Sequence, residues 1–477
     1  MIGQPAVSNQ PPGITDQQSL ITRAGLTASS TTIARERVLL VLAGLFMAAG
    51  LTLLALVRTQ SDAANVLSHV SPRLEAIGLA LALAVWTACF AAIHIFLNRY
   101  RRERDPLLLP IAALLTGLGL IEIARLAPNF MTRQLIWLGV STVVLVAVLK
   151  APSDLKWLRR YKYTWLLIGL LLLALTFVIG VNPEGAGLAL WLGGPLGMFF
   201  QPAELLKLLF VAYLAAYLAE KREVARSLGV HPDHPHYLSL PYLMPLLAMW
   251  GVALILLMAQ QDLGAAVLLY LSFLIMLYLA SGQVRYLVIG GALLFAAAIG
   301  GYLLIGRVQG RIDTWLNPWA DAAGSSYQIV QSLIALASGG GLGQGLGQGW
   351  PDVILPAAHT DMPLAAIGEE LGLAGALGIV ACFAFLTLRG LRIASITRTT
   401  FGRLLAAGLA SLIGMQAWII MAGNANLVPL TGVTLPFVSY GGSSLLMSFI
   451  CLGLLLQISA DRDRGLCVTG VEGMDRM

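Results

Sequence analysis

The sequence predicts an all-α fold, a polytopic membrane helical bundle of about 12 transmembrane helices. The first reason is composition, because 58% of the 477 residues are hydrophobic and only 11% are charged, with a mean hydropathy of +0.80. A soluble domain of this length does not hide so much apolar surface. The second reason is that the apolar residues gather in runs of about 18 to 25, the length at which a helix crosses a hydrocarbon core of about 30 Å.

Each apolar run is assigned to one transmembrane helix in chain order, although a short run is also compatible with a re-entrant segment. The predicted spans are 38–57, 76–97, 106–124, 134–149, 163–181, 202–219, 241–259, 263–281, 286–306, 363–388, 404–422 and 437–458.

The chain divides into a tail, a helix pair, a core and a second tail. The first residues are rich in Ser, Thr, Gln, Pro and Gly and lack the pattern of a cleaved signal, so residues 1–37 are predicted to be a disordered cytoplasmic tail. Residues 38–104 hold two spans without a polar motif, which indicates an additional two-helix transmembrane segment. Residues 105–460 form a core of about ten helices with one large loop, 307–362, and residues 461–477 form a second cytoplasmic tail.

Positive charges orient the bundle. Lysine and arginine cluster in alternate connections, whereas the connections between them hold few cations. The clustered residues are Arg99, Arg101, Arg102, Arg104, Lys150, Lys156, Arg159, Arg160, Lys162, Lys221, Arg222, Arg226, Arg285, Arg389, Arg392, Arg398 and Arg403. Under the positive-inside rule these connections and both termini are cytoplasmic, so loop 307–362 is extracytoplasmic. These connections also account for the net charge of +6, which therefore requires no nucleic-acid partner.

Histidine and cysteine form no recognisable metal or disulfide framework. His231, His234 and His236 suggest a metal site, but Pro232 and Pro235 interrupt the segment and no cysteine or acid pair completes a ligand set, so a solvated loop is favoured. Three cysteines fall in predicted spans and one in the C-terminal tail, which predicts no disulfide. They are Cys89, Cys382, Cys451 and Cys467.

The sequence FQPAELLK at 200–207 begins a predicted span with a charged pair. Pro202 suits the first turn of a helix, and Glu204 in the same turn is favoured by the helix dipole. Lys207 lies three residues later on the same face. The pair either serves a functional site near an outer cavity or only neutralises two charges inside the membrane.

Ionisable groups concentrate in the polar interval 315–372. A chain that is mostly buried in lipid keeps such residues where they face water, protein or substrate. Asp321 lies among turn residues, and it is either a turn former or a carboxylate that reaches an outside cleft. The glycines at 337–349 predict a flexible segment, which either lets a large ligand approach the backbone or serves only as a linker.

Two predicted helix starts carry acidic residues. Asp262 in QQDLG either caps the following helix or has a functional role. Thr360 or Asp361 is expected to cap the next span in the same way. Glu369 and Glu370 follow about two turns into that span, where a carboxylate needs a partner or a cavity.

The last polar motif is LVPLTGVTLPFVSYGGSSLL at 427–446. Its prolines break a helix, and its paired glycines permit close approach of backbones. Ser443 and Ser444 either bond a phosphate or only satisfy the helix backbone during helix packing.

These motifs, taken in order, resemble the SEDS family of cell-wall polymerases, the RodA, FtsW and SpoVE proteins. The resemblance rests on FQPAELLK, on QDLG, on the stretch from NPWADAAGSSYQIVQSLIALASGG to HTDMPLAAIGEELG, and on LTGVTLPFVSYGGSSLL. It covers roughly residues 105–460, and it implies the SEDS fold for this core. The additional helix pair, followed by DPLLLPIAALLTGLGL, is similar to RodA-like members from actinobacteria and related lineages.

The resemblance implies an inverting peptidoglycan glycosyltransferase that polymerises lipid II at the outer face of the bacterial cytoplasmic membrane, for elongation or division. It also implies a class B penicillin-binding protein as partner. Asp321 matches the family's essential aspartate and is the expected catalytic base. The expected substrate-binding residues are Gln201, Glu204, Lys207, His359, Asp361, Glu370, Ser443 and Ser444.

No metal ligand and no firm cofactor is assigned. The pyrophosphate leaving group needs positive charge, which Lys207, Arg307, Arg311 or a divalent cation (Mg or Mn) can supply. The chain departs from the family pattern at Ala322, where proline is usual, and at Ala357 and Met362, where glutamate and phenylalanine are common. It also has Leu190 where many members carry arginine, so the 182–201 loop holds no cation.

Two alternatives come from other functional classes. A lipid-linked oligosaccharide flippase or other transporter accounts for buried charges but gives the long outside loop no role. A non-catalytic scaffold for a class B penicillin-binding protein is the other alternative.

Overall fold

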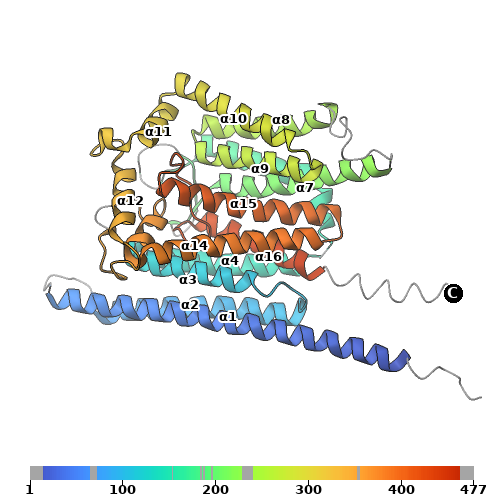
Figure 1. Ribbon diagram of the computed structural model, residues 1–477, viewed down its shortest axis with the longest axis horizontal. Coiled ribbons are helices and arrows are strands. Elements are labelled where there is room, and N and C mark those ends of the chain that lie inside the picture. Colours follow the sequence, from blue (N-terminus) through green and yellow to red (C-terminus); the bar gives the residue numbers. More distant parts are fainter. Residues whose placement is uncertain are drawn as a thin grey trace, which may run out of the picture.

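The protein is a bundle of long helices that lie side by side along one direction (Figure 1). Its computed structural model describes residues 14–64, 72–152, 154–182, 185, 189–194, 197–227, 240–351 and 355–461. The long helices are α1 (Ile14–Ala64), α2 (Pro72–Tyr100), α3 (Leu108–Leu126), α4 (Met131–Lys150), α6 (Lys162–Ile179), α7 (Pro202–Ser227), α8 (Leu240–Ala259), α9 (Leu263–Ser281), α10 (Arg285–Leu304), α14 (Pro363–Ile396), α15 (Thr400–Asn424) and α16 (Gly442–Asp461).

The predicted fold class is confirmed. Among the described residues, eleven helices are long and apolar enough to cross a membrane. The remaining predicted span, 241–259, is helix α8, whose apolar part Leu243–Ala259 is shorter than the others. Since α8 packs against α6 and α9, it belongs to the same bundle.

Short elements fill the connections. They are η1 (Pro128–Phe130), α5 (Lys156–Arg160), β1 (Leu192–Gly193), β2 (Phe199–Phe200), α11 (Gly306–Leu316), η3 (Pro318–Asp321) and α12 (Tyr327–Ser338). The two strands pair antiparallel, with Leu192 opposite Phe200 and Gly193 opposite Phe199. This small hairpin leads directly into α7.

The N-terminal segment differs from the predicted disordered tail. Helix α1 begins at Ile14 and runs without interruption into the first span. The reason is that no proline follows Pro12 in this segment, while Ala, Leu and Arg favour helix, so the helix of the span extends outward. The three histidines of the 228–239 segment and Cys467 lie outside the described residues.

Helix α7 forms the centre of the bundle, because its side chains are buried almost all round. It packs against α6, α9, α15 and α16. By contrast, α10 is the most exposed of the spans and leaves most of its apolar surface free for lipid. A hydrophobic helix with such a surface is compatible with the lipid environment but not with water.

Helices α1 and α2 lie along the outside of α3 and α4 (Figure 1). Trp86 of α2 donates its indole N–H to the carbonyl of Ala113 on α3 at 3.2 Å. At one end of the pair, buried Glu36 accepts a hydrogen bond from Arg104 at 2.6 Å and contacts His94 Nδ1 at 2.8 Å. The pair is therefore docked on the core through both apolar and charged contacts.

The two ends of the bundle differ. α11 and α12 lie at one end, here called the loop end, and the chain leaves α16 at the other (Figure 1). Arg125, near the end of α3, donates to the carbonyl of Gly349 at 2.9 Å, which places the end of α3 at the loop end. The start of α3, preceded by Arg101 and Arg104, is therefore at the opposite end, here called the basic end.

Candidate active site

Asp321 closes the short helix η3 in the arm that joins α10 to α12 at the loop end. Pro318 starts η3, because its fixed φ suits a first helical position. The Asp321 carboxylate accepts hydrogen bonds from the Ser325 backbone N–H at 2.7 Å and from the Ser325 hydroxyl at 2.9 Å. These bonds hold the pKa of Asp321 below its ordinary value, so this exposed side chain is ionised at neutral pH and can accept a proton.

Both interpretations of Asp321 fit this geometry, because it shapes its own turn and still faces solvent. Its carbonyl accepts from the N–H groups of Gly324 and Ser326, each at 3.2 Å. A side chain at Gly324 would meet both carboxylate oxygens at 2.5 Å, so this position must stay small. Among the described residues, every hydrogen bond of Asp321 stays within this turn, so none joins it to another candidate residue.

Glu204 and Lys207 form an ion pair inside the bundle, near the start of α7. Lys207 Nζ lies 2.8 Å from Glu204 Oε1 and 3.1 Å from Gln416 Oε1 of α15. Both charged side chains are buried, and the adjacent cavity of about 20 Å³ has room for about one water molecule. A sugar or a pyrophosphate does not fit there, so the geometry favours charge neutralisation over direct substrate contact.

Gln201 and Ser443 join the start of α7 to the start of α16. The Gln201 backbone N–H donates to the Ser443 hydroxyl at 2.8 Å, and its side-chain amide lies 3.5 Å from Asp262 Oδ2. Asp262 caps α9, because its Oδ1 accepts from the N–H of Ala265 at 2.9 Å. In the part of the chain described here, the buried Ser444 hydroxyl has no hydrogen-bond partner.

Two guanidinium groups face the loop end from helix α11. Arg311 donates to the carbonyls of residues 430–431 at 3.0 and 3.2 Å, and it is half-buried. Burial and the neighbouring Arg307 lower the pKa of Arg311, while Asp262 and Asp361 act in the opposite direction. The predicted residues Asp262 and Asp361, which are far apart in the sequence, therefore both lie near one cationic centre, Arg311.

The predicted cap of α14 was wrong. Neither Thr360 nor Asp361 caps this helix through its side chain; instead, Asn424 Oδ1 accepts from the N–H of Leu364 at 3.1 Å. The Asn424 amide also donates to the Asp361 carbonyl at 2.8 Å. Asn424 is fully buried at the end of α15, so it satisfies the free N–H from a distant element. The available signal for this residue was an asparagine at the end of a mostly apolar span.

The glycine-rich segment 337–349, predicted to be flexible, is fastened to α14. The backbone N–H groups of Gln344 and Gly345 donate to the carbonyls of Glu369 and Glu370 at 2.9 and 3.0 Å. The helical conformation of α14 is interrupted at Gly372, where φ is 66° and ψ is −167°. Because this break removes the helical partners of the preceding carbonyls, the glycine-rich segment satisfies them instead.

Glu370 is buried and belongs to the same attachment. Its Oε1 lies 3.1 Å from Arg125 Nε, and its Oε2 accepts from the N–H of Gly347 at 3.0 Å. Glu369 Oε1 accepts from the N–H of Trp350 at 2.9 Å. The two carboxylates thus hold the loop against α14, and both are buried.

His359 lies in the segment before α14, with its ring stacked on Phe130 at 5.4 Å between centroids. This aromatic contact brings the end of α3 and the start of α14 together. The sequence motif gave no indication of the contact, because Phe130 is remote in the chain.

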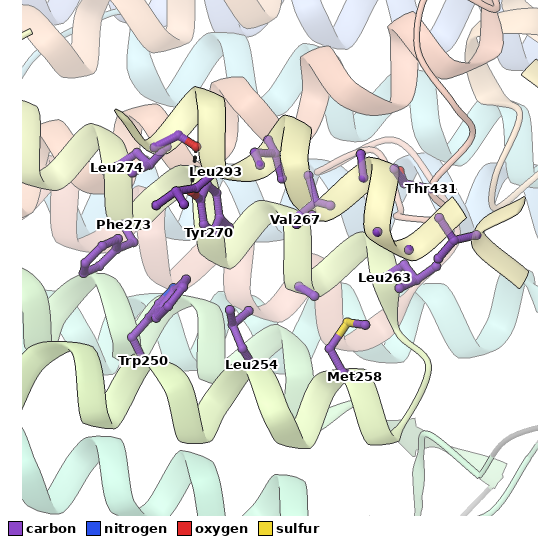
Figure 2. Close-up of a pocket in the computed structure, with 18 of the residues that line it drawn as sticks. Trp250, Leu254, Met258, Leu263, Val267, Tyr270, Phe273, Leu274, Leu293 and Thr431 are labelled. Carbon is purple, nitrogen blue, oxygen red and sulfur yellow. Dashed lines mark hydrogen bonds between the residues drawn. The ribbon is translucent and has the colours of Figure 1, made fainter. Parts of the chain in front are cut away.

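A long apolar cavity of about 790 Å³ lies between α8, α9 and α10 (Figure 2). Trp250 of α8 and Tyr270 of α9 line it, and the Tyr270 hydroxyl donates to the carbonyl of Gly290 on α10 at 2.7 Å. At the loop end its wall includes Thr431 and Arg311, so the apolar space reaches the cationic centre. Sequence reasoning missed this cavity, because side chains that face a cavity and side chains that face lipid have the same hydropathy.

The donor set for a metal ion is incomplete. No three His, Cys, Asp or Glu side chains in the described ranges lie close enough together to hold a metal ion. Asp262 already caps a helix, and Asp361 lies beside Arg311. A Mg or Mn ion therefore stays a hypothesis, one in which phosphate oxygens of a substrate supply the missing ligands.

Comparison with known proteins identifies the family of this chain. A family described as Cell cycle protein, which includes FtsW, RodA and SpoVE, matches residues 112–464. The peptidoglycan glycosyltransferase RodA of Mycobacterium tuberculosis is 41% identical over 392 residues, which is 79% of this chain and 82% of that protein. The probable peptidoglycan glycosyltransferase FtsW of Geobacter sulfurreducens is 40% identical over 310 residues, which is 64% of this chain and 79% of that protein.

Solved structures share the fold. One chain comes from a structure on the coordination of polymerization and crosslinking by a peptidoglycan synthase complex; the TM-score is 0.63 and the identity 26%, over 75% of this chain and 98% of that chain. The rod shape determining protein RodA of Thermus thermophilus gives a TM-score of 0.55 at 26% identity, over 75% of this chain and 97% of that chain. The family match begins within α3, so it leaves out α1 and α2.

Proposed function

Since this chain belongs to the FtsW, RodA and SpoVE family and is a peptidoglycan glycosyltransferase, we propose that it polymerises lipid II into glycan strands at the outer face of a bacterial cytoplasmic membrane. The loop end is the outer end in this proposal, with both termini in the cytoplasm. Support for this orientation comes from the cations of the basic end, because positive connections remain inside.

The junction between the apolar cavity and Arg311 carries the proposal. Lipid II combines a long apolar polyprenyl chain, a pyrophosphate and a disaccharide that bears a peptide. An apolar cavity of about 790 Å³ suits part of the polyprenyl chain. Arg307 and Arg311 suit the pyrophosphate, because guanidinium groups bind phosphate oxygens in pairs.

Helix α11 connects these features with the chemical step. It carries both arginines, and η3 with Asp321 follows it directly. A substrate whose lipid lies in the cavity and whose pyrophosphate lies at α11 therefore places its sugars toward the arm that bears the exposed carboxylate. The loop end thus combines an apolar space, two cations and an ionised acid along one helix and the turn that follows it.

The reaction is an inverting displacement. The 4-hydroxyl of an acceptor N-acetylglucosamine attacks the anomeric carbon of a donor N-acetylmuramic acid from the face opposite the pyrophosphate. Asp321 takes the hydroxyl proton as general base while the new C–O bond forms. The bond to the pyrophosphate breaks, and the polyprenyl pyrophosphate leaves with the electron pair, stabilised by Arg307 and Arg311.

Three of the other predicted site residues, Glu204, Lys207 and Glu370, act through structure in this proposal. Glu204 and Lys207 hold α7 to α15 below the site, and Glu370 fixes the glycine-rich segment. A class B penicillin-binding protein is the proposed partner, supported by the likeness to a chain of a peptidoglycan synthase complex. Elongation and division are both compatible with this assignment.

The test uses purified protein in proteoliposomes with labelled lipid II, and the product is separated on a gel. The wild type is expected to form polymer, and Asp321→Asn is expected to lose about 10²- to 10⁴-fold of the rate, as for one positioned acid–base group. Asp154→Asn is the matched control, because Asp154 is an exposed, hydrogen-bonded aspartate at the basic end. Its rate should equal that of the wild type.

Other outcomes decide between the functional classes. Movement of lipid II across the bilayer without polymer would support a flippase. Polymerisation by a folded Asp321→Asn protein at the wild-type rate would remove Asp321 from the mechanism and favour a scaffold role for this arm.

A further inference from the structure

Three aromatic side chains from distant segments meet at the loop end. Phe130 closes η1, His359 precedes α14, and Tyr440 precedes α16. The ring centroids are 4.7 Å apart for Phe130 and Tyr440, 5.4 Å for Phe130 and His359, and 5.9 Å for His359 and Tyr440. The three distances show that the rings form a triangle and not a stacked column. Each of the three residues is half-buried, so part of this aromatic surface is exposed.

Backbone contacts fix the positions of these rings. The Tyr440 N–H donates to the His359 carbonyl at 2.8 Å, and the Ser439 hydroxyl donates to the Thr360 carbonyl at 2.7 Å. The same Ser439 hydroxyl accepts from the N–H of Leu435 at 2.9 Å. The aromatic surface is therefore preorganised and does not depend on flexible side chains alone.

Arg133 adds a cation to this surface. Its guanidinium lies 5.8 Å from the centre of the Phe130 ring and near the Tyr440 hydroxyl. A side chain at Gly197 would come within 3.2 Å of the same guanidinium, so Arg133 also lies against the 182–201 loop, which has no cation of its own. Within the described ranges no carboxylate pairs with Arg133.

The hydroxyl of Tyr440 keeps its proton. Burial raises the pKa of Tyr440, and the contact with Arg133 only partly offsets this effect. The phenol can accept from Arg133 and still donate its own proton to a ligand oxygen. The surface thus presents aromatic faces, a neutral hydroxyl donor and a cation within one patch.

We propose that Phe130, His359, Tyr440 and Arg133, here called the aromatic platform, bind the amino-sugar rings of the growing glycan strand. The proposal rests on the function given above and adds a glycan subsite to it. Pyranose rings pack their apolar C–H faces on aromatic rings, and their hydroxyl and acetamido groups need polar partners at the edge. The platform offers both kinds of contact.

The location supports a glycan over a lipid. Tyrosine and tryptophan that anchor a protein in the membrane interface point their rings toward lipid. Here the rings pack on one another around a guanidinium, which is unsuited to an acyl chain. Asp361, two residues after His359, lies beside Arg311, so the platform adjoins the proposed pyrophosphate site.

In this proposal the platform holds the strand, while the general base is Asp321 on the arm between α10 and α12. Loss of one aromatic face is expected to change how long the strand stays bound, with little change in the rate of the first transfer. An aromatic contact of this kind changes an equilibrium by about three- to tenfold. The mean strand length should therefore fall by about three- to tenfold when one face is removed.

The test variant is Phe130→Leu, which keeps an apolar side chain and removes the ring. Purified full-length protein in proteoliposomes is given labelled lipid II, and the initial rate and the strand-length distribution are both measured. Shorter strands are expected, with a fall in strand length that exceeds any fall in the initial rate. Phe385→Leu, at an exposed position of α14, is the matched control and should give wild-type strands.

A second readout uses binding. Soluble glycan oligosaccharides of alternating N-acetylglucosamine and N-acetylmuramic acid should inhibit the wild type and inhibit Phe130→Leu about three- to tenfold less well. Tyr440→Phe keeps all three rings and removes only the hydroxyl, so it should fold even if Phe130→Leu does not. It should weaken inhibition by the same oligosaccharides, without a change in thermal melting temperature.

The two proposals fail in different ways. If the wild type makes no polymer, the proposed function fails. The proposed function stands if the wild type polymerises and Asp321→Asn does not. If, in that case, folded Phe130→Leu and Tyr440→Phe give wild-type strand lengths and inhibition, only the platform proposal is overturned. Equal shortening in Phe385→Leu would also overturn it, because the effect would then not depend on the platform.

Discussion

At the scale of single residues, the acidic side chains fall into two physical groups. Asp321 is exposed, and its hydrogen bonds come from its own turn. Glu204 and Glu370 are buried, and each has a basic partner on a helix. A buried carboxylate that is already paired is a poor proton acceptor for a substrate, whereas an exposed ionised carboxylate is available for one.

The hydrogen bond from the Ser325 hydroxyl lowers the pKa of Asp321. A base with a lowered pKa is ionised at neutral pH, and activity that depends on it disappears only as the pH falls through that lowered pKa. Ser325→Ala removes one of the two hydrogen bonds, so the pKa of Asp321 should rise toward its ordinary value. The acidic limb of the kcat/KM profile should move to higher pH, while Ser338→Ala, at the end of α12, should leave it in place. An acidic limb that does not move in Ser325→Ala would contradict the assignment.

The Glu204 and Lys207 pair should behave as one unit. Glu204→Gln or Lys207→Met alone leaves one buried charge without its partner, which costs about 3 to 5 kcal/mol of unfolding free energy. The double variant should lose less than the sum of the two single losses, as measured by denaturation in detergent. Strict additivity would show that the 2.8 Å contact has no energetic consequence.

Some of these contacts were predictable from the sequence and others were not. The spacing of Glu204 and Lys207 on one helical face predicted their pairing, because local geometry alone decides it. The cap by Asn424 was not predictable in this way, because it joins α15 to a helix start 60 residues earlier. Contacts such as Phe130 with His359 have the same origin, since only the tertiary fold brings these segments together.

At the scale of elements, α14 is two helical segments with a break at Gly372. This residue has a backbone conformation that is essentially restricted to glycine. A side chain there would meet the backbone N of Gly343 at 2.3 Å. The break and the glycine-rich segment therefore require each other.

Gly372→Ala should destabilise this attachment. The backbone strain alone costs about 1 to 3 kcal/mol, and the clash with the glycine-rich segment adds to it. We expect a lower melting temperature and faster proteolysis within 340–349. Gly378→Ala is the control on the same helix, because nothing lies within 4 Å of the added carbon there. Equal stability of the two variants would mean that the break is not required.

The sequence did not predict this break, because Gly372 lies within one continuous apolar run. Gly372 is followed by Leu, Ala and Gly, and such a run is typical of transmembrane helices. The glycines at 337–349 were predicted to form a flexible segment, but their backbone freedom serves close packing against α14. Composition alone does not separate these two uses of glycine.

At the scale of the whole molecule, the proposed orientation can be tested by labelling. Cysteine at Leu342, an exposed position at the loop end, should react with an impermeant maleimide in intact cells. Cysteine at Arg102, before α3 at the basic end, should react only after permeabilisation. The background should be a variant without the four native cysteines that keeps polymerase activity. The reverse labelling pattern would contradict the proposed orientation and would place Asp321 on the cytoplasmic side.

Most of the architecture was accessible from the sequence, because the bilayer imposes length and hydropathy on each span. The order of the spans and the position of the polar interval follow from that constraint. The apolar cavity was not accessible, since Trp250 and Tyr270 look like any lipid-facing residues. The start of α1 at Ile14 was also missed, because a polar composition does not prevent a helix from extending beyond the membrane.

The ion pair between Arg125 and Glu370 also constrains biogenesis. The two residues are 245 positions apart, so α3 enters the membrane well before the ribosome has made its acidic partner. The glycine-rich segment is likewise made before the opened part of α14 to which it bonds. The loop end therefore reaches its final form only after α14 has been made, because both attachments depend on that helix.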